Sequence, residues 1–542
     1  MKLFERFKKL MARVSDGITA TTADMKVSRE FKDIFELGGV PAFNQFYNFG
    51  IFPWKYVYRG FYKAWHIIKA PTILNPDATR HLAYLNMAKA LSSELAGMVW
   101  TDQCEVNLTS NGVEDVENDK LHRFVNDVLE HNNFNVKMLE AIEQAAALGG
   151  EALKVWYEVR HDQDGNEIPN SGTIKIGYCM SDQFVPTAWN NAEITEGVFV
   201  ERTAKNGYYY TRLEWHEWNG TTYVVRNELY KAEIKQNGSE TQDILGFRYP
   251  LSALYPYMAE LAEIPNIEKS LFSYFRTPTA NNLDDNSPLG VSIYANAMDT
   301  LHALDIAYDS FVREFRLGKK RIIVPARMIK QVIDPVSGKA VRYFDATDET
   351  YEALSTDDPD SLKIQDNSVE LRVEEHVAGI NAFLNILCLQ VGLSAGTFSF
   401  DAKQGLKTAT EVVSENSKTY KTVKNFQNMI KPAVVRLVEN IIAIASLYNV
   451  EYEGEQVANL ASNGFEVSVM MDDGITQDRQ TNINEGIQLV NAKLMSKKTF
   501  LTDPKYGQGL TEEQAEAELQ QIANESQVNA INVDMMRINT AE

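Results

Sequence analysis

Apolar side chains recur at helical spacing in two segments of the second half of the sequence. Steps of three and four residues place such side chains on one face of an α-helix. The first run is Ile293, Ala297, Leu301, Leu304, Tyr308, Phe311 and Phe315, and the second is Val377, Ile380, Leu384, Leu387 and Val391. Pro288 suits a helix start, where its missing donor is not needed. The pattern predicts helices at 287–317 and 373–392, each with one apolar side.

The segment between these two helices has a different pattern. Short apolar runs flank a turn in which Pro335 and Gly338 fit the required backbone angles. We therefore expect 318–372 to form a small α/β insertion carried at the tips of the two helices.

A mixed region precedes the first helix. Helical spacing covers 78–98 and 119–148, and the glycines at 149 and 150 make a natural helix stop. Alternating apolar and polar residues then predict strands at 151–160, 173–179, 196–203, 208–218 and 221–229. Asn206-Gly207 and Asn219-Gly220 are hairpin signals, because both residue types tolerate positive φ. Residues 1–286 should thus combine helices with an antiparallel sheet, and the whole chain is predicted to be an α+β protein.

A glycine-rich loop at 393–407 follows the second helix and leads to a third. Glycine permits backbone conformations that other residues resist, so this loop is suited to motion. Thr408 and Glu411 have the form of a capping box, which predicts a helix start. That helix should continue to about residue 448, with a kink at Pro432. The remainder predicts a strand at 465–471 and helices at 477–493 and 511–524, before a polar tail.

The composition narrows the range of functions. Lys and Arg number 53 against 74 Asp and Glu, so the formal charge is −21, which opposes general adhesion to nucleic acid or anionic lipid. Three separated cysteines form no metal or redox motif and indicate a reducing cytosol. The start of the sequence is basic and amphipathic, and we favour a docked or frayed helix there over a membrane-surface helix. Polar residues inside the most apolar helices argue against a membrane span.

Catalytic motifs are missing from the sequence. It contains neither the glycine-rich loop of nucleotide hydrolases nor Gly-x-Ser-x-Gly nor His-Glu-x-x-His, and its eight histidines are scattered. We therefore predict no catalytic residues, no metal site and no cofactor. One enzymatic alternative stays open: Trp189, Trp215 and Trp218 would form a sugar platform near an acidic pair, although sheet packing is the commoner use of such residues.

The order of these elements resembles tailed-bacteriophage portal proteins, particularly those of long-tailed phages. The resemblance is carried by Gly-Gly-Glu-Ala-Leu-Lys at 149–154, Ser-Pro-Leu-Gly at 287–290, Gly-Leu-Ser-Ala-Gly-Thr-Phe at 392–398 and Lys-Thr-Ala-Thr-Glu at 407–411. It implies a wing at 1–286 crossed by a long kinked helix at 408–450, stem helices at 287–317 and 373–392, a clip at 318–372, a tunnel loop at 393–407 and a mostly helical crown at 451–542.

The same resemblance implies a function without catalysis. Portal proteins form rings, usually of twelve subunits, at one capsid vertex, and double-stranded DNA enters and leaves through the central channel. Implied partners are a terminase ATPase, head-tail adaptors, and the major capsid and scaffolding proteins, in the host cytoplasm during assembly and in the virion afterwards. Another virion protein, such as a head-to-tail adaptor, is an alternative, although adaptors are usually shorter and lack this order of elements.

The candidate site residues form three groups. The tunnel-loop candidates for facing DNA are Phe398, Phe400, Asp401, Lys403 and Lys407; the clip candidates are Lys319, Lys320 and Arg321; the candidate channel acids are Asp299, Asp305 and Asp309. Acids repel DNA and let it slide, whereas isolated cations touch phosphates without reading sequence. The clip cations would equally pair with acids of an adjacent subunit, and the phenylalanines would equally pack loop against loop. For Lys418, Lys421 and Lys424, pairing with neighbouring carboxylates is favoured.

Overall fold

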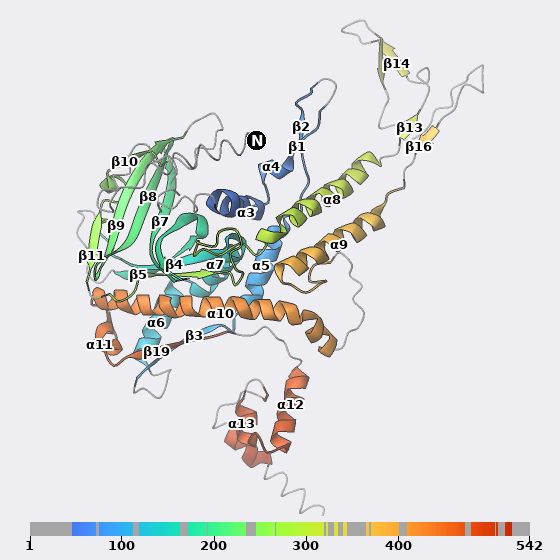
Figure 1. Ribbon diagram of the computed structural model, residues 1–542. Helices are drawn as coiled ribbons and strands as arrows, with labels where there is room; N and C mark the ends of the chain where they lie inside the picture. The colour runs from blue at the N-terminus through green and yellow to red at the C-terminus, as the bar shows by residue number, and fades with distance from the viewer. Residues whose placement is uncertain are drawn as a thin grey trace, which may run out of the picture.

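The computed structural model of the 542-residue chain describes most of its first half and parts of the second (Figure 1). The described residues are 46–71, 75–111, 119–162, 168, 172–191, 193–234, 245–265, 267–318, 321–323, 330–333, 340–343, 365–367, 370–399, 409–471, 479–503, 506–507 and 515–522. At 321–367, 409–416 and 479–482 only the backbone is described. The basic start of the sequence and the polar tail lie outside these residues.

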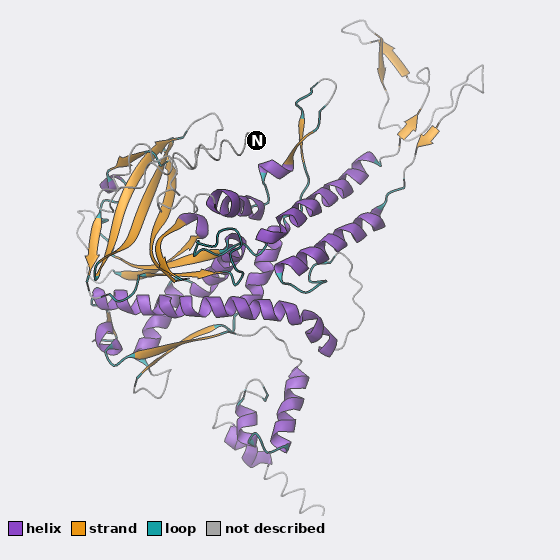
Figure 2. Ribbon diagram, in the orientation of Figure 1, coloured by secondary structure: helices purple, strands orange, loops and turns teal. Residues whose placement is uncertain are grey.

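The largest sheet of the body is antiparallel (Figure 2). Its strands lie in the order β10-β9-β8-β7-β6, and β11 also pairs with β9. The bounds are β6 (Phe184–Asn190), β7 (Glu193–Lys205), β8 (Tyr208–Asn219), β9 (Thr222–Glu233), β10 (Phe247–Tyr249) and β11 (Leu261–Ile264). Asn206, Gly207 and Gly220 have φ of 52°, 78° and 64°, and two-residue turns join β7 to β8 and β8 to β9. The predicted Asn-Gly hairpins are confirmed.

A second antiparallel sheet, in the order β12-β4-β5, contacts helices of the body. Its strands are β4 (Gly150–Glu158), β5 (Thr173–Met180) and β12 (Phe272–Arg276), and they contact α7 (Phe134–Leu148) and α10 (Ala409–Leu447). The helices α3 (Phe52–Tyr58), α5 (Met87–Val99) and α6 (Lys120–His131) pack in turn on α7. The first six residues of β4 are buried, so both faces of this sheet are covered. α7 ends at Gly149 (φ 95°), where a Cβ atom would lie 2.2 Å from the carbonyl oxygen of Gly290. Only glycine fits this position.

Two helices project from the body and pack on each other (Figure 1). They are α8 (Met298–Leu317) and α9 (Val373–Val391), so α8 begins eleven residues after its predicted start at 287. A short 3₁₀ turn, η7 (Ala295–Ala297), precedes it. The Ile293 amide donates to the Ala146 carbonyl at 3.0 Å, and Thr277 Oγ1 donates to the Val291 carbonyl at 2.6 Å. These contacts with the body hold the preceding segment in a non-helical path.

Four short strands are described between α8 and α9. β13 (Arg321–Ile323) pairs with β16 (Gln365–Asn367), and β14 (Lys330–Ile333) pairs with β15 (Ala340–Tyr343). The second pair brackets the predicted turn. The described residues of the insertion are therefore strands, at the tips of the two helices as expected (Figure 1).

The long helix α10 is continuous over 39 residues, and Pro432 lies inside it. In Figure 1 the helix bends near its right-hand end rather than midway, which differs from the predicted kink at Pro432. Both Pro432 and Asn428, the residue one turn earlier, are exposed. Water can therefore bond the Asn428 carbonyl that loses its helical donor, and the helix stays intact.

The chain after α10 partly returns to the body. β19 (Phe465–Met470) pairs with β3 (Glu105–Ser110), and α11 (Val457–Ala461) packs on α10 and α6. Residues 451–470, which include the hairpin of β17 (Glu451–Tyr452) and β18 (Glu455–Gln456), thus belong to the body and not to the expected crown. α12 (Arg479–Asn491) and α13 (Lys497–Thr502) pack on each other below the body in Figure 1. None of the described helices combines the length and apolar character that a membrane crossing needs.

Candidate functional site

The predicted apolar seams of α8 and α9 pack within the chain. Their buried members are Leu301, Leu304, Ile380, Leu384, Leu387 and Val391. Near the tips, the Arg372 guanidinium donates to Glu314 at 2.9 and 3.1 Å and lowers the pKa of that carboxyl to about 2. The two helices therefore form one unit before any second subunit is added.

A different set of apolar side chains on these helices faces outward. They are Ile306, Leu317, Ile386 and Leu389, which are between 46% and 65% exposed, whereas Phe315, the last member of the predicted seam, is 47% exposed. Single exposed apolar residues are normal, but four on one pair of helices are a candidate surface for contact with another protein chain. The sequence interpretation missed this surface. The available signal was that Ile306, Ile386 and Leu389 are apolar residues off the buried seam.

The three candidate channel acids have different surroundings. Asp299 is exposed, whereas Asp305 and Asp309 are 8% and 5% exposed. These two carboxylates bind a segment of the same chain that lies beside α8 in Figure 1 and contains α4 (Lys63–His66), β1 (Ile67–Lys69) and β2 (Thr79–His81). Their position off the apolar seam therefore reflects an internal contact. Of the three, Asp299 alone has the exposure that a channel-lining role requires.

Asp309 holds the end of this segment. Both terminal nitrogens of Arg80 donate to its two oxygens, at 2.9 and 2.6 Å, and the Ala83 amide donates at 3.0 Å. Burial raises the pKa of Asp309, but the hydrogen bonds from Arg80 and Ala83 lower it by a larger amount. The pKa of Asp309 therefore lies below the ordinary value. The pair has the bidentate geometry of a strong charge-assisted contact.

Asp305, one helical turn earlier, contacts residues at both ends of the segment. The Leu85 amide donates to it at 3.0 Å, and His66 Nε2 lies 3.1 Å away. His66 Nδ1 accepts the Tyr62 amide, so the neutral ring carries its proton on Nε2 and donates to Asp305. Burial raises the pKa of Asp305 despite these donors. We call the contacts of Asp305 and Asp309 with this segment the stem latch.

Replacing Arg80 with Met should loosen the stem latch. Met keeps an apolar stem but removes the paired charge from Asp309, so we expect a loss of about 1–3 kcal/mol in the free energy of unfolding. Amide hydrogen exchange across 79–85 should rise, and mass spectrometry can measure it. Arg59→Met, at an exposed arginine, is the control. Equal exchange in both variants would contradict the contact.

The predicted tunnel loop is described only at its beginning. Gly392 ends α9 at φ 84°, and Thr422 Oγ1 donates to its carbonyl at 2.6 Å. The Ser394 amide donates to Thr419 Oγ1 at 2.9 Å, so this part of the loop is fastened to α10. Phe398 is half-buried and packs against the core of its own chain. The other loop candidates, Phe400, Asp401, Lys403 and Lys407, lie outside the described residues.

The basic candidates are only partly described. Lys319 and Lys320 lie outside the described residues, and Arg321 is placed by its backbone at the start of β13. Lys418, Lys421 and Lys424 are exposed on α10, and Lys418 Nζ donates to the Leu389 carbonyl at 2.7 Å. Within the described residues these three lysines form no ion pair with a carboxylate, so the favoured pairing is not seen inside one chain.

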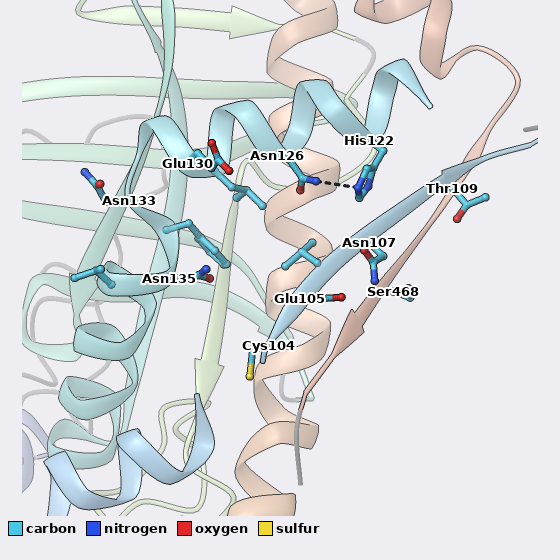
Figure 3. Close-up of a pocket in the computed structure, with 14 residues that line it drawn as sticks. Cys104, Glu105, Asn107, Thr109, His122, Asn126, Glu130, Asn133, Asn135 and Ser468 are labelled. Carbon is cyan, nitrogen blue, oxygen red and sulfur yellow. Dashed lines mark hydrogen bonds between the residues drawn. The ribbon is translucent and has the colours of Figure 1, made fainter. Parts of the chain in front are cut away.

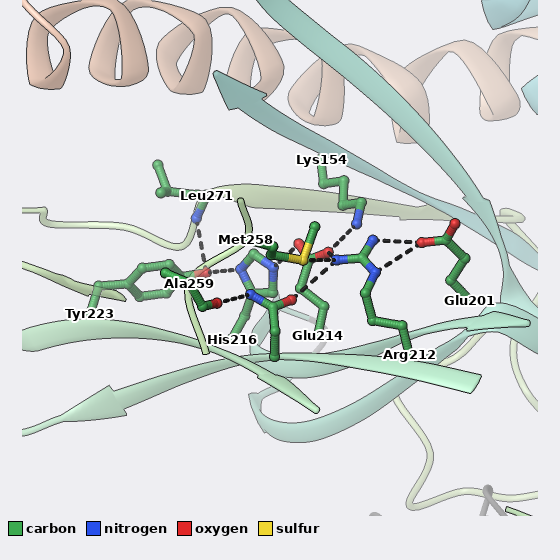
Figure 4. Close-up of polar contacts among 10 residues, drawn as sticks. Lys154, Glu201, Arg212, Glu214, His216, Tyr223, Met258, Ala259 and Leu271 are labelled. Atoms are coloured by element: carbon green, nitrogen blue, oxygen red, sulfur yellow. Dashed lines mark hydrogen bonds and ion pairs between the residues drawn. The ribbon is translucent and has the colours of Figure 1, made fainter. Parts of the chain in front are cut away.

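A buried ionic network joins the two sheets (Figure 4). Lys154 Nζ of β4 and Arg212 Nη1 of β8 donate to Glu214 Oε2 at 2.6 and 2.7 Å. His216 Nε2 lies 2.9 Å from the other oxygen, and its Nδ1 lies 2.7 Å from the Tyr223 hydroxyl. Burial raises the pKa of Glu214, but Lys154, His216 and Arg212 together lower it well below the ordinary value. Both carboxylate oxygens are occupied by internal donors, so the network has a structural role.

The residues of the enzymatic alternative are also engaged in packing. Trp215 is buried, and Trp189 and Trp218 pack against the core, so they present no open platform to a sugar. In the described part of the chain no group of three His, Cys, Asp or Glu side chains is placed to hold a metal ion.

The arrangement of body, paired helices, tip insertion and long helix agrees with a known family. The model of phage portal proteins, SPP1 Gp6-like, matches residues 55–530. No curated protein sequence matches the chain. The matched range includes both body sheets, α8, the insertion, α9 and α10. Because the match spans most of the chain, this protein belongs to the phage portal protein family, SPP1 Gp6-like.

Proposed function

We propose that this protein forms a closed ring, of twelve subunits as is usual for portals, at one vertex of a tailed-phage capsid. The observation that carries the proposal, beside the family, is the exposed apolar surface of α8 and α9. Closed rings bury one face of each subunit against a different face of the next. Covering Ile306, Ile386 and Leu389 by a neighbouring copy would remove this surface from water.

The ring is the channel for double-stranded DNA during packaging and ejection. A charge of −21 per subunit opposes tight binding of the duplex, which favours sliding. Asp299 is the remaining stem acid suited to face the channel, and Phe400, Lys403 and Lys407 are candidates for brief contact with DNA. The protein acts without catalysis: terminase docks at the insertion between α8 and α9 and supplies the energy. Head-tail adaptors later use the same tips, and capsid and scaffolding proteins surround the wing.

Replacing Leu389 with Glu should prevent ring formation. The substitution puts a charge on the most exposed apolar position of the stem, 65% exposed, where burial against a neighbour would then require desolvation of a carboxylate. Light scattering after size exclusion should report rings for the unchanged protein and subunits for the variant. Phe247→Glu is the matched control, because Phe247 is 62% exposed at the edge of the large sheet. Intact rings with Leu389→Glu would refute the proposed interface.

A further inference from the structure

The hairpin of β1 and β2 carries a row of side chains that point away from α8. Arg80 of β2 turns toward α8, where it binds Asp309. Successive side chains of a strand alternate between its two faces, and Ile68 lies opposite Arg80 in the pairing of β1 with β2. The other side of the hairpin, which we call the hairpin face, carries Ile67, Lys69, Thr79 and His81.

The hairpin face is partly apolar and open to water. Lys69, Thr79 and His81 are exposed, and Ile67 is partly exposed. Phe61 is 37% exposed and stacks on His81, with the ring centroids 5.6 Å apart, so it extends this surface.

α9 has a row of exposed residues opposite its buried seam. The positions 375, 379, 382, 386 and 389 are spaced by four and three residues and therefore share one side of the helix, which we call the α9 face. Its members are Glu375, Gly379, Ala382, Ile386 and Leu389. A Cβ atom added at Gly379 would meet no atom of the described chain within 4 Å. Two small residues in the middle of this face leave room for a bulky neighbour.

The hairpin and α9 lie on nearly opposite sides of α8. Asp309 holds the hairpin, whereas Phe311 points toward α9, where its ring centroid lies 5.5 Å from that of His376. Two residues of an α-helix turn by about 200°, so the two contacts leave α8 in nearly opposite directions. Figure 1 shows the same order, with α8 between the hairpin and α9. A closed ring buries two different faces of each subunit, and this arrangement offers two.

The hairpin is oriented along the stem by its bonds to α8. Arg80 binds Asp309, and the Leu85 amide binds Asp305, which is one turn nearer the start of α8. β2 therefore runs toward the body, and Lys69, which pairs with Thr79, lies on the side of Arg80 that is nearer the stem tips.

This orientation places opposite charges at the same level. The contact of Phe311 with His376 puts Glu375 at the level of α8 just beyond Asp309, where Lys69 lies. Both side chains are exposed, and neither forms an ion pair with another described residue. Arg372, a cation close to Glu375 on the same helix, is bound by Glu314.

We propose that the hairpin face of each subunit packs on the α9 face of the next subunit. This contact rests on the proposed ring and supplies the second face of its interface. Subunits of a ring are related by rotation about one axis, so equal levels of neighbouring stems meet. Lys69 then pairs with Glu375, and Phe61 and Ile67 cover Ala382 nearer the body. The stem latch fixes the hairpin on its own α8, so the face is preformed and assembly costs less entropy.

Cross-linking of assembled rings tests this contact. Thr79→Cys and Gly379→Cys are introduced together, and the rings are treated with a short bis-maleimide. A ladder of covalent dimers, trimers and larger species is expected on a denaturing gel, because each link joins two chains. The unchanged protein gives the background from its own three cysteines.

The matched control for the ladder is Asn135→Cys with Gly379→Cys, which should stay at the background. Asn135 is exposed and lines a groove of about 870 Å³ between α6, the start of α7 and β3 (Figure 3). No residue that lines this groove belongs to the hairpin face or the α9 face.

Light scattering before cross-linking separates this contact from the ring itself. Rings that form without a ladder for Thr79→Cys with Gly379→Cys would overturn the proposed contact and leave the ring intact. Subunits of the unchanged protein that stay monomeric would overturn both.

Charge reversal gives a second test. Lys69→Glu alone and Glu375→Lys alone should each raise, at least tenfold, the protein concentration at which rings dissociate, and the double variant should restore the original value. Lys205→Glu, at an exposed lysine at the end of β7, should leave that concentration unchanged. Thermal unfolding checks that every variant is folded. A double variant that dissociates as readily as the single variants would overturn the pairing of the two charges.

Discussion

Replacing Glu214 with Gln is expected to lower the free energy of unfolding by about 3–5 kcal/mol. The substitution keeps the shape of the side chain but leaves Lys154 without its carboxylate partner, whereas Arg212 keeps its contact with Glu201. Leaving a buried cation without its partner destabilises the folded protein by much more than the original ion pair stabilised it. The single amide oxygen of Gln cannot serve as acceptor for both Lys154 and His216, which contact different oxygens of Glu214. Thermal and denaturant unfolding of the purified protein would measure the loss.

The same strand offers a matched control for this prediction. Glu217 pairs with Arg226 at 3.2 Å, but both side chains are partly exposed, so Glu217→Gln should cost no more than about 1 kcal/mol. The pKa of Glu214 in the folded protein is below its ordinary value. The contribution of this carboxylate to the free energy of unfolding is therefore complete at neutral pH, and it is lost only as the pH falls through the lowered folded-state pKa. Equal destabilisation by both variants at pH 7 would contradict the special role of the buried network.

Replacing Glu151 with Gln is expected to have the opposite sign and to stabilise the protein at neutral and alkaline pH. Glu151 is fully buried, and neither of its carboxylate oxygens has a hydrogen-bond partner in the described residues. Burial, and then the nearby Asp182, raise its pKa well above the ordinary value, and Lys55 offsets this in part. The carboxyl therefore stays protonated to a higher pH in the folded protein than in the unfolded chain.

The pH dependence follows from the sign of that shift. When the folded-state pKa is raised, the contribution of the carboxyl to the free energy of unfolding is complete below the unfolded-state pKa. Above that pH the contribution is lost at about 1.4 kcal/mol per pH unit, until the folded-state pKa is reached. Gln cannot ionise, so the melting temperatures of the two proteins should agree at acidic pH and diverge as the pH rises above the ordinary pKa of a glutamate. Glu158→Gln, at the exposed end of the same strand, should show no divergence. Parallel curves for the unchanged protein and Glu151→Gln would contradict a protonated buried carboxyl.

Local sequence patterns were sufficient to predict many of the helices and strands. The spacing of apolar residues located α8 and α9, and Asn206-Gly207 located a hairpin, because these patterns depend on near neighbours in the chain. The start of α8 was placed too early for a non-local reason. Pro288 suits a helix start by itself, but the bond from the Ile293 amide to Ala146 joins residues far apart in sequence, and no local pattern contains it.

The residues of the candidate site depend even more on contacts between distant parts of the sequence, which local patterns do not predict. An acid off the apolar seam is expected to face water, yet Asp309 is covered by Arg80, which lies 229 residues earlier. β19 could not be assigned to the body from sequence, because its partner β3 precedes it by some 350 residues. The exposed Leu389 was recognisable as apolar, but its exposure depends on which helix face α8 leaves uncovered.

The stem latch has a mechanical consequence. Asp305 and Asp309 grip residues 66–85 at two points, and four residues of α-helix separate these points by about 6 Å. A segment bonded to a helix at one point can rotate relative to that helix, whereas a segment bonded at two points rotates together with the helix. In the proposed ring, a torque that DNA or a docked motor exerts on α8 would therefore be carried into residues 66–85 as a rotation.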